Sequence, residues 1–547
     1  MKKTNKSSVI VSKYNEGLWQ QIVTGRIFES RIFTTLVTFF LIILYLLLAY
    51  KEPFRQNNLI SNLEPGPDTF YYSVPAWNFI HGRGFRMESN GIEIPQIVPP
   101  IYGLYLAPFF KIFNDVRAYY FGNLILGFIS IGLFLRLIKV FLNKKNVFIE
   151  GVLGLIFVSN FYFYNLATLL MAENILLPLT LAAMILGLEK FSNKNLILSI
   201  VVGILLSLTK VSSLPVVLIL GLMTLFKLKN INRKTLLVII GLGGIGLMLV
   251  TILVIIPNSR LLKSVGEVFA FEFARNNVPV FIKEFLGIGG KYLWFNNPQI
   301  ESLIGWLSFA GLIFGIMIKR FRSNTLWFMA LIFLMIVFHA SMKYAEGRYI
   351  STVIPVYMIF IGVILDLIKN KKIMFTATLI LACLYLGLRT NVNGFYERKV
   401  TTLKRQILNN QLENNEVPWN YKAMENINKY FSKRDNDVYL ITLLTPFYVQ
   451  YFGNGNFNYL PFSEYQEFSG INKSYVEAVY ENDGSLVNLY KRLINENKKL
   501  YLTNYYMVNY HGAMDPVYKN IENNFALEQV SDGCMDLCKI YKLSIKK

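Results

Sequence analysis

Charged side chains are scarce in this sequence. Asp, Glu, Lys and Arg make up 16% of its 547 residues, whereas hydrophobic residues make up 54% and aromatic residues 15%. The mean hydropathy is +0.40. A soluble domain must cover its surface with polar groups, so this composition excludes a wholly soluble protein. Most of the chain is instead expected to lie in a membrane.

Acidic residues are the scarcer of the two charged classes. The chain has 34 Asp and Glu against 55 Lys and Arg, which gives a net charge of +21. Such an excess could serve nucleic-acid binding. However, the basic residues are concentrated in short loops between apolar runs, where they set membrane topology and attract anionic lipid. No nucleic-acid partner is therefore expected.

Cysteine and histidine are also rare, with three residues of each. Cys383 lies within an apolar run, whereas Cys534 and Cys538 lie in the segment DGCMDLCKIYKL near the C-terminal end. The last two form either a small-loop disulfide or two free thiols, because sequence spacing does not show that their Cα atoms come within bonding reach. No second Cys/His pair accompanies them, so no zinc site is predicted.

A cleavable signal sequence is not recognisable at the N-terminal end. Residues 1–31 are polar and basic, and the first apolar run begins near Ile32. A signal peptide has a shorter basic region and a cleavage site of small residues. We expect residues 1–31 to form a cytoplasmic arm that leads into a signal-anchor helix.

Long apolar runs recur along the chain, most of them near the length that crosses the hydrocarbon core of a bilayer. They predict an α-helical polytopic membrane protein with about eleven transmembrane helices, at residues 33–50, 118–142, 147–165, 168–188, 195–209, 213–227, 235–256, 302–318, 325–342, 349–368 and 373–389.

Every second loop between these runs is short and basic. These loops hold Lys144 and Lys145; Lys190 and Lys194; Lys227, Lys229, Arg233 and Lys234; Lys319, Arg320 and Arg322; and Lys369, Lys371 and Lys372. Lys and Arg favour cytoplasmic loops, so the N-terminal arm and these loops are expected inside. The long loops 51–117 and 257–301 and the C-terminal tail then lie outside the membrane.

The tail differs in composition from the apolar part of the chain. Residues 391–547 are rich in Asn, Lys, Glu and Tyr, with strand-like runs DVYLITLL (437–444) and KKLYLTNYYM (498–507) between amphipathic stretches. This pattern predicts a small extracytoplasmic α/β domain of ordinary size. Residues 32–390 are expected to form the transmembrane domain.

Four charged residues fall at one membrane face once the loops are assigned to sides. Asp68 follows the first run, Glu173 opens the fourth, Lys210 follows the fifth, and Arg348 opens the tenth. Ionisable groups at this depth are costly and often functional. The two cations suit a lipid phosphate, and a carboxylate suits activation of an acceptor hydroxyl.

Each of these residues also has a simpler interpretation, and these alternatives stay open. Asp68 fits a helix N-cap, and Glu173 fits a packing partner for a neighbouring helix. Lys210 fits a side chain that extends to the headgroups, and Arg348 fits an anchor of a helix end. His81, in a Gly-rich loop, fits a hydrogen-bonding residue better than a metal ligand.

The segment PDTFYYSVPAWNFIHGRGF, followed by PPIYGLYLAPFFKIF at 99–113, resembles the first outside loop of membrane glycosyltransferases of the C-type fold. It is most similar to the branch of protein O-mannosyltransferases and lipid A aminoarabinose transferases. The resemblance covers about residues 30–390, and an extracytoplasmic C-terminal domain is common in these families. The matching positions are Asp68, Tyr72, Gly82, Gly84, Pro99, Pro100, Glu173, Thr209, Lys210, Arg348, Tyr349 and Pro355.

The resemblance implies transfer of a sugar from a polyprenyl-phosphate donor to a lipid, glycan or protein acceptor on the outer face of the cytoplasmic membrane. It also implies juxtamembrane helices in the first outside loop. The implied catalytic residues are Asp68 and Glu173, the donor phosphate-binding residues are Lys210, Arg348 and Tyr349, and the substrate-cavity residues are Tyr72, His81, Arg83 and Tyr102.

The sequence departs from the family pattern at two places. Many relatives carry adjacent acids in the first loop, but Pro67 and Thr69 flank Asp68 here, and a lone carboxylate is a poor Mg²⁺ or Mn²⁺ site. No cofactor is assigned, and a divalent metal is not expected in this loop. Some relatives also carry a basic residue before the Pro-Pro pair, where this chain has Gln96.

Three other functions stay open. A lipid-linked sugar flippase or other transporter would place charges near mid-membrane and show inverted repeats, and neither is evident. A catalytically inactive scaffold remains an alternative because a fold does not guarantee its function. A polysaccharide polymerase shares the location and substrate class, and only the first-loop pattern argues against it.

Overall fold

The computed structural model describes residues 31–54, 60, 63, 68–89, 91–94, 96, 98–143, 146–227, 248, 271–288, 298–343, 347–388, 392–393, 399–400, 419–464, 472–507, 512–532 and 539–546. The chain divides into two compact units. Unit 1 combines Met1–Tyr50, Asn123–Ala167 and Glu173–Glu413, and unit 2 combines Lys51–Gly122, Thr168–Ala172 and Asn414–Lys547. The division into domains at residue 390 stays a prediction.

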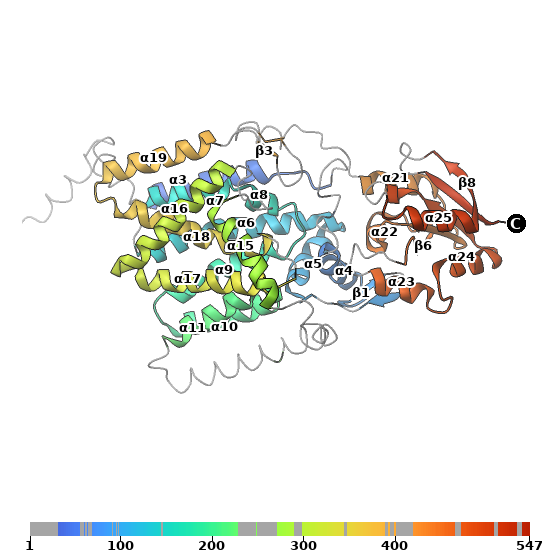
Figure 1. Cartoon of the computed structure of the whole chain (residues 1–547), viewed down its shortest axis with the longest axis horizontal. Coiled ribbons are helices and arrows are strands. Elements are labelled where there is room, and N and C mark those ends of the chain that lie inside the picture. The colour runs from blue at the N-terminus through green and yellow to red at the C-terminus, as the bar shows by residue number, and fades with distance from the viewer. Residues whose placement is uncertain are drawn as a thin grey trace, which may run out of the picture. The chain divides into compact units, whose positions relative to one another are not determined.

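Unit 1 is built from helices (Figure 1). They are α3 (Arg31–Ala49), α6 (Tyr119–Leu142, whose first turn belongs to unit 2), α7 (Val147–Val158), α8 (Phe161–Leu166), α9 (Glu173–Leu188), α10 (Asn193–Ser207), α11 (Leu214–Leu225), α15 (Phe271–Leu286), α16 (Pro298–Met317), α17 (Lys319–Ala340), α18 (Ile354–Leu367) and α19 (Lys371–Leu388). Short 3₁₀ turns η4 (Val211–Ser213) and η6 (Gly347–Ile350) precede α11 and α18, and strands β3 (Val392–Asn393) and β4 (Lys399–Val400) pair near the end of the unit.

Three helical stretches within the described residues are long and apolar enough to cross a membrane. These are Ile32–Ala49, Val116–Leu142 and Lys319–Ala340, and the other apolar helices are shorter. The helical architecture therefore agrees with the prediction, whereas the number of eleven spans stays a prediction. The predicted run 235–256 lies outside the described residues except for Met248.

The predicted run 147–165 is broken into two helices. α7 ends at Val158, and Asn160 starts α8 by accepting a hydrogen bond from the backbone N–H of Phe163 at 3.1 Å. Asn at this position satisfies one of the N–H groups that a helix leaves open at its start. The apolar pattern continues across the break, which explains why it reads as one run.

Helix α18 forms part of the core of unit 1. It is buried along nearly its whole length, as expected for a helix that is apolar on all sides. In contrast, α3, α17 and α19 expose large apolar side chains, including Phe40, Phe333 and Ile373. Such surfaces suit contact with lipid and agree with a membrane location.

The first part of unit 2 comes from the loop that follows α3. Helix α4 (Asp68–Ile80) and helix α5 (Ile101–Phe113) flank a hairpin of β1 (Met87–Ser89) and β2 (Ile92–Ile94), and η3 (Val116–Ala118) follows α5. The predicted helices of this loop are thus present. A turn between α4 and β1 uses Gly82 and Gly84 at φ of 75° and 81°, a conformation that glycine adopts without strain.

The second part of unit 2 is an α/β domain with a five-stranded sheet. Its strands are β5 (Val438–Thr442), β6 (Asn458–Pro461), β7 (Lys499–Thr503), β8 (Phe525–Ser531) and β9 (Ile540–Ile545), in the order β6-β5-β7-β9-β8. β5 runs parallel to β6 and β7, and β9 runs antiparallel to β7 and β8. The helices are α21 (Trp419–Tyr430), α22 (Pro446–Phe452), α23 (Asn472–Tyr480), α24 (Leu486–Asn495) and α25 (Asp515–Asn524), with a 3₁₀ turn η8 (Tyr505–Met507).

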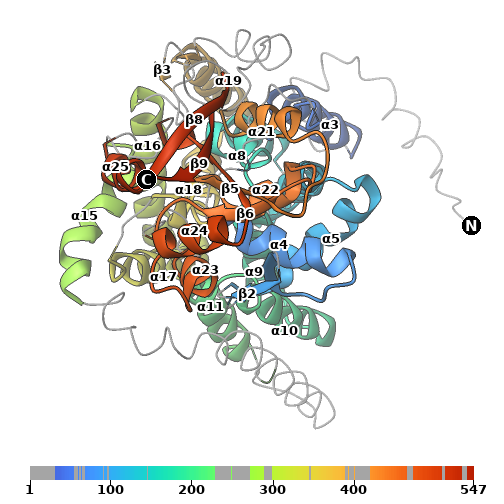
Figure 2. The same cartoon turned by 90° about the vertical axis from the view of Figure 1, so that its right-hand side faces the viewer.

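The two parts of unit 2 pack together through α4 and α22, which lie side by side in Figure 2. The Tyr451 hydroxyl donates a hydrogen bond to the buried Ser73 hydroxyl at 2.9 Å. Phe70 packs on Phe447 with ring centroids 5.8 Å apart, and Trp77 packs on Tyr451 at 5.5 Å. The first loop and the tail therefore pack together through buried side chains in unit 2.

Candidate functional site

An ion pair between Glu173 and Lys210 is the centre of the candidate site. The Lys210 ammonium donates to a Glu173 carboxylate oxygen at 2.6 Å, and only 4% of the glutamate side chain is exposed. Glu173 opens α9, where the partial positive charge of a helix N-terminus favours a carboxylate. The pair therefore joins two residues that are 37 positions apart in the chain.

A sharp turn between α10 and η4 presents Lys210. The Thr209 hydroxyl donates to the Leu205 carbonyl at 2.6 Å, and the Ser213 hydroxyl donates to the Leu206 carbonyl at 2.8 Å. The Leu206 carbonyl also accepts hydrogen bonds from the backbone N–H groups of Thr209 and Lys210. The turn is thus fixed on both sides of the lysine.

Tyr349 connects the second cation to the pair. The Lys210 ammonium lies 5.6 Å from the centre of the Tyr349 ring, and the Arg348 guanidinium carbon lies 5.5 Å from the same ring. These distances are within the range of cation–π attraction. The charges of both Lys210 and Arg348 also act on the Glu173 carboxylate. We call Glu173, Lys210, Arg348 and Tyr349 the charged cluster.

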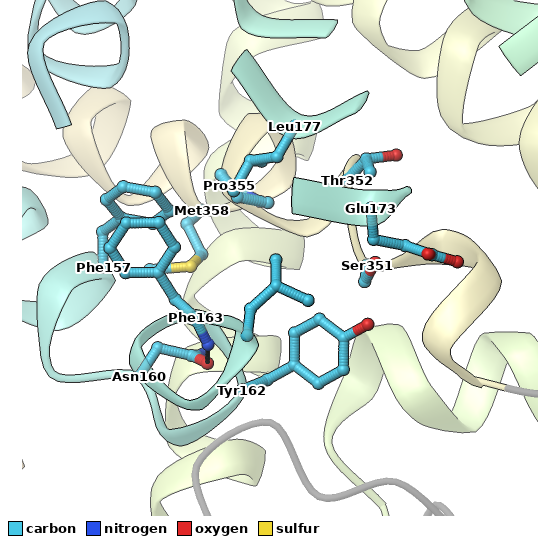
Figure 3. A pocket seen from close by; sticks show the side chains of 11 residues that line it. Phe157, Asn160, Tyr162, Phe163, Glu173, Leu177, Ser351, Thr352, Pro355 and Met358 are labelled. Atoms are coloured by element: carbon cyan, nitrogen blue, oxygen red, sulfur yellow. Dashed lines mark hydrogen bonds between the residues drawn. The ribbon is translucent and has the colours of Figure 1, made fainter. Parts of the chain in front are cut away.

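A narrow cavity of about 10 Å³ adjoins the charged cluster, which is roughly the space that one water molecule needs. Figure 3 shows Glu173, Ser351 and Thr352 at one end of it, with the Tyr162 hydroxyl directed toward that end. Phe157, Phe163 and Met358 lie at the other end. The cavity thus joins a charged end to a mainly aromatic end, at which Asn160 also lies.

Asp68 is the first residue of α4, in unit 2. Its negative charge there is favourable because of the helix dipole, which agrees with the helix-start alternative. Burial raises the pKa of Tyr71 well above the ordinary tyrosine value, and the nearby charge of Asp68 adds to this shift. The predicted proximity of Asp68 to the charged cluster stays a prediction.

Tyr72 and Tyr102 lie together between α4 and α5. Their ring centroids are 5.2 Å apart in an edge-to-face arrangement, and both residues are buried. The helices approach closely because Gly103 has no side chain: a Cβ there would lie 2.8 Å from the Tyr72 carbonyl oxygen. These tyrosines help to pack unit 2, and their place in a substrate cavity stays a prediction.

His81 and Arg83 are exposed at the end of α4. His81 Nδ1 lies 2.8 Å from the Trp77 carbonyl oxygen, and its ring packs on the Trp77 ring at 4.5 Å. The Arg83 carbonyl accepts a hydrogen bond from Arg86 Nε at 2.5 Å. The structure thus shows His81 in local contacts that fit the hydrogen-bonding alternative, and a role for either residue with substrate stays a prediction.

Cys534 and Cys538 lie outside the described residues, so the disulfide and the free thiols both stay open. Within the described residues, no three His, Cys, Asp or Glu side chains gather in a group that would hold a metal ion.

Two features of the sites carry no signal in the sequence. His339, in the last turn of α17, stacks on Tyr349 with ring centroids 5.3 Å apart and an interplanar angle of 22°. Tyr451 in the tail bonds Ser73 in the first loop across 378 positions. Both depend on how distant segments pack, which periodicity does not encode.

No family model and no curated protein matches the sequence. Solved structures match it well in fold. ArnT from Cupriavidus metallidurans bound to undecaprenyl phosphate is 13% identical with a TM-score of 0.60, and the match covers 93% of this chain and 97% of that one. The same protein in the apo state is 14% identical with a TM-score of 0.54, over 95% and 98% of the two chains.

This likeness concerns the fold, because the identities are low. It extends over nearly the full length of both chains, including much of the C-terminal segment 391–547 that the motif resemblance did not cover. ArnT, a lipid A aminoarabinose transferase, belongs to the branch that the first-loop motif resembles. The chain therefore has the C-type fold of membrane glycosyltransferases.

Proposed function

We propose that this protein is a glycosyltransferase that moves a sugar from a polyprenyl-phosphate donor to an acceptor at the outer face of the cytoplasmic membrane. The observation that carries the proposal is the charged cluster within unit 1 of a C-type fold. Its two cations and its carboxylate come from three separate parts of the chain. A buried carboxylate and two partly buried cations brought together in this way are costly and frequently functional.

Lys210 and Arg348 are assigned to the donor phosphate. The phosphate gains negative charge as the glycosidic bond breaks, and cations placed at its oxygens stabilise that charge. ArnT was solved with undecaprenyl phosphate bound, which makes a polyprenyl phosphate a reasonable ligand to test for this chain. Both cations lie near the centre of the Tyr349 ring, at 5.6 Å and 5.5 Å.

We assign to Glu173 a role in positioning the Lys210 side chain, in addition to its predicted catalytic role. It holds the Lys210 ammonium at 2.6 Å, and 4% of the glutamate side chain and 20% of the lysine side chain are exposed. One oxygen of the Glu173 carboxylate is already engaged by the Lys210 ammonium. The general base for the acceptor hydroxyl is therefore assigned to Asp68, at the start of α4.

The charges of the cluster lie at helix ends. Glu173 opens α9, Lys210 follows α10, and Arg348 lies in η6 before α18. A transporter would be expected to place such charges near mid-membrane on broken, repeated helices. The arrangement favours the transferase over the flippase.

The test uses the full chain purified into nanodiscs and supplied with sugars linked to undecaprenyl phosphate. A transferase releases undecaprenyl phosphate and places the sugar on an added lipid, glycan or peptide acceptor, and Arg348→Ala reduces both products together. In vesicles, a flippase would move the intact donor across the bilayer without cleaving it. An inactive scaffold would bind the donor and do neither, and each of these results would refute the proposed reaction.

A further inference from the structure

His339 is a buried histidine that no step of the proposed reaction uses. It lies in the last turn of α17 and has no solvent exposure. Among the described residues, neither ring nitrogen has a hydrogen-bond partner. Buried polar groups in native proteins are nearly always satisfied, so this ring requires an explanation.

The surroundings of His339 connect it to the charged cluster. Its ring stacks on Tyr349, the residue that Lys210 and Arg348 also approach. Lys210 and Glu173 are close enough to act electrostatically on the imidazole. Among the described residues, two apolar rings also lie near it, Phe338 at 5.2 Å and Phe281 at 6.4 Å between ring centroids.

The end of α17 is held in place by a neighbouring helix. The Asn277 side-chain amide on α15 donates to the Ala340 carbonyl at 3.1 Å and to the Met342 carbonyl at 2.7 Å. The first bond satisfies a carbonyl that the helix end leaves open, and the second holds the segment that follows the helix. They also fix the backbone on the C-terminal side of His339, so the position of the ring is set by packing rather than by a hydrogen bond of its own.

We propose that His339 is a third phosphate-binding residue of the charged cluster, which donates an imidazole N–H to a phosphate oxygen of the lipid carrier. The inference rests on the proposed function, because it takes the carrier phosphate as the ligand of Lys210 and Arg348. A neutral imidazole always keeps one N–H donor, and a phosphate oxygen is a strong acceptor. Because Lys210 and Arg348 are both positively charged, the ligand expected beside them is an anion.

The alternative is a histidine that only fills space in the core. The two interpretations predict different results for a change to phenylalanine, which keeps the ring and removes its polar atoms. If His339 only packs in the core, His339→Phe should leave the affinity for the lipid phosphate unchanged. If His339 binds the phosphate, the variant lacks one charge-assisted hydrogen bond to it. Such bonds are strong enough to change affinity by about 10- to 100-fold.

A matched control exists on the same helix. Thr325 is also fully buried, and its hydroxyl likewise has no partner among the described residues. It lies 14 positions before His339, or about 21 Å along α17, so it is far from the cluster. Thr325→Val removes a buried polar atom without touching the proposed site.

The experiment measures binding of undecaprenyl phosphate to the full chain in detergent, with undecaprenol as the phosphate-free lipid and inorganic phosphate as the lipid-free anion. His339→Phe should weaken undecaprenyl phosphate binding about 10- to 100-fold and leave undecaprenol binding unchanged. His339→Gln, which keeps an N–H donor, should recover part of the loss. Thr325→Val should bind as the wild type does, and the unfolding temperature of both apolar variants without lipid should be unchanged or raised.

Unchanged affinity of His339→Phe for undecaprenyl phosphate, with the wild type still preferring it over undecaprenol, would overturn the inference and leave the proposed function intact. If the wild type binds undecaprenol as tightly as undecaprenyl phosphate, the phosphate site is absent and both fail. If the wild type binds inorganic phosphate as tightly as undecaprenyl phosphate, the ligand of the site is a soluble anion rather than the lipid carrier. This result would also overturn the inference.

Discussion

Asp68 is the residue whose two interpretations differ most in their consequences. It begins α4, so its charge suits the helix start, and it is also the acid that the resembled family places in this loop. Asp68→Asn separates the two roles, since Asn serves a helix start about as well as Asp but cannot accept a proton. We expect the variant to fold normally and to lose transfer by a factor on the order of 10² or more.

The measurement is single-turnover transfer in nanodiscs, with the unfolding temperature as the control for folding. Near-wild-type transfer in Asp68→Asn would leave the helix-start role as the sufficient account of this residue. Loss of both transfer and thermal stability would likewise point to a structural role rather than a catalytic one.

Arg348 is expected to bind the donor phosphate through its guanidinium. Arg348→Ala should weaken transition-state stabilisation by roughly 1.5–3 kcal/mol, the usual worth of a hydrogen bond to a charged group. Arg348→Lys should restore only part of this, because an ammonium does not offer the planar pair of N–H donors. Rates at saturating and limiting donor concentration give the comparison, and full activity of Arg348→Ala with normal thermal stability would remove this residue from the site.

Among the elements, the contact between α4 and α5 depends on one glycine. A Cβ at Gly103 would lie 2.8 Å from the Tyr72 carbonyl oxygen, a backbone atom that cannot rotate away. Gly103→Ala should therefore destabilise the protein by about 1–3 kcal/mol, the usual cost of overpacking. Gly132 on α6 is the matched control, because a Cβ there meets no atom within 4 Å. The unfolding temperature of Gly103→Ala should be clearly lower than that of Gly132→Ala. Equal unfolding temperatures would show that α4 and α5 can move apart at little cost.

The elements also show how much of the fold is predictable from the sequence. The apolar runs locate the described helices of unit 1 except α15, which lies in the predicted loop 257–301, and the runs at 437–444 and 498–507 locate β5 and β7. The antiparallel strands β8 and β9 were not predicted, because FALEQVS and IYKLSI are partly exposed strands that mix polar and apolar residues. The break at Asn160 was missed because apolarity continues on both sides of the cap.

Side-chain partners were less predictable than elements. The rule on basic loops placed Glu173 and Lys210 on one face, and the structure shows that they form an ion pair. His339 has no recognisable motif, since its significance comes from stacking on Tyr349. The bond between Ser73 and Tyr451 joins residues whose local sequences give no indication of each other.

For the whole molecule, the proposed site depends on the membrane topology, that is, on which loops lie in the cytoplasm and which lie outside. The basic short loops all fall inside only if the C-terminal residue lies outside the cytoplasmic membrane. A single cysteine in an otherwise Cys-free chain tests this. Ser544 in β9 is exposed, and Ser544→Cys should react with an impermeant maleimide in intact cells.

The control is Ser323→Cys, at an exposed position near the start of α17 beside Lys319, Arg320 and Arg322. It should react only after the cells are permeabilised, because this basic segment is predicted to be cytoplasmic. Labelling of Ser323→Cys in intact cells, and of Ser544→Cys only after permeabilisation, would show that the protein has the opposite orientation in the membrane. Glu173, Lys210 and Arg348 would then face the cytoplasm, and transfer from a donor presented at the outer leaflet would be impossible at this site. The orientation assay therefore tests the location of the reaction independently of any activity measurement.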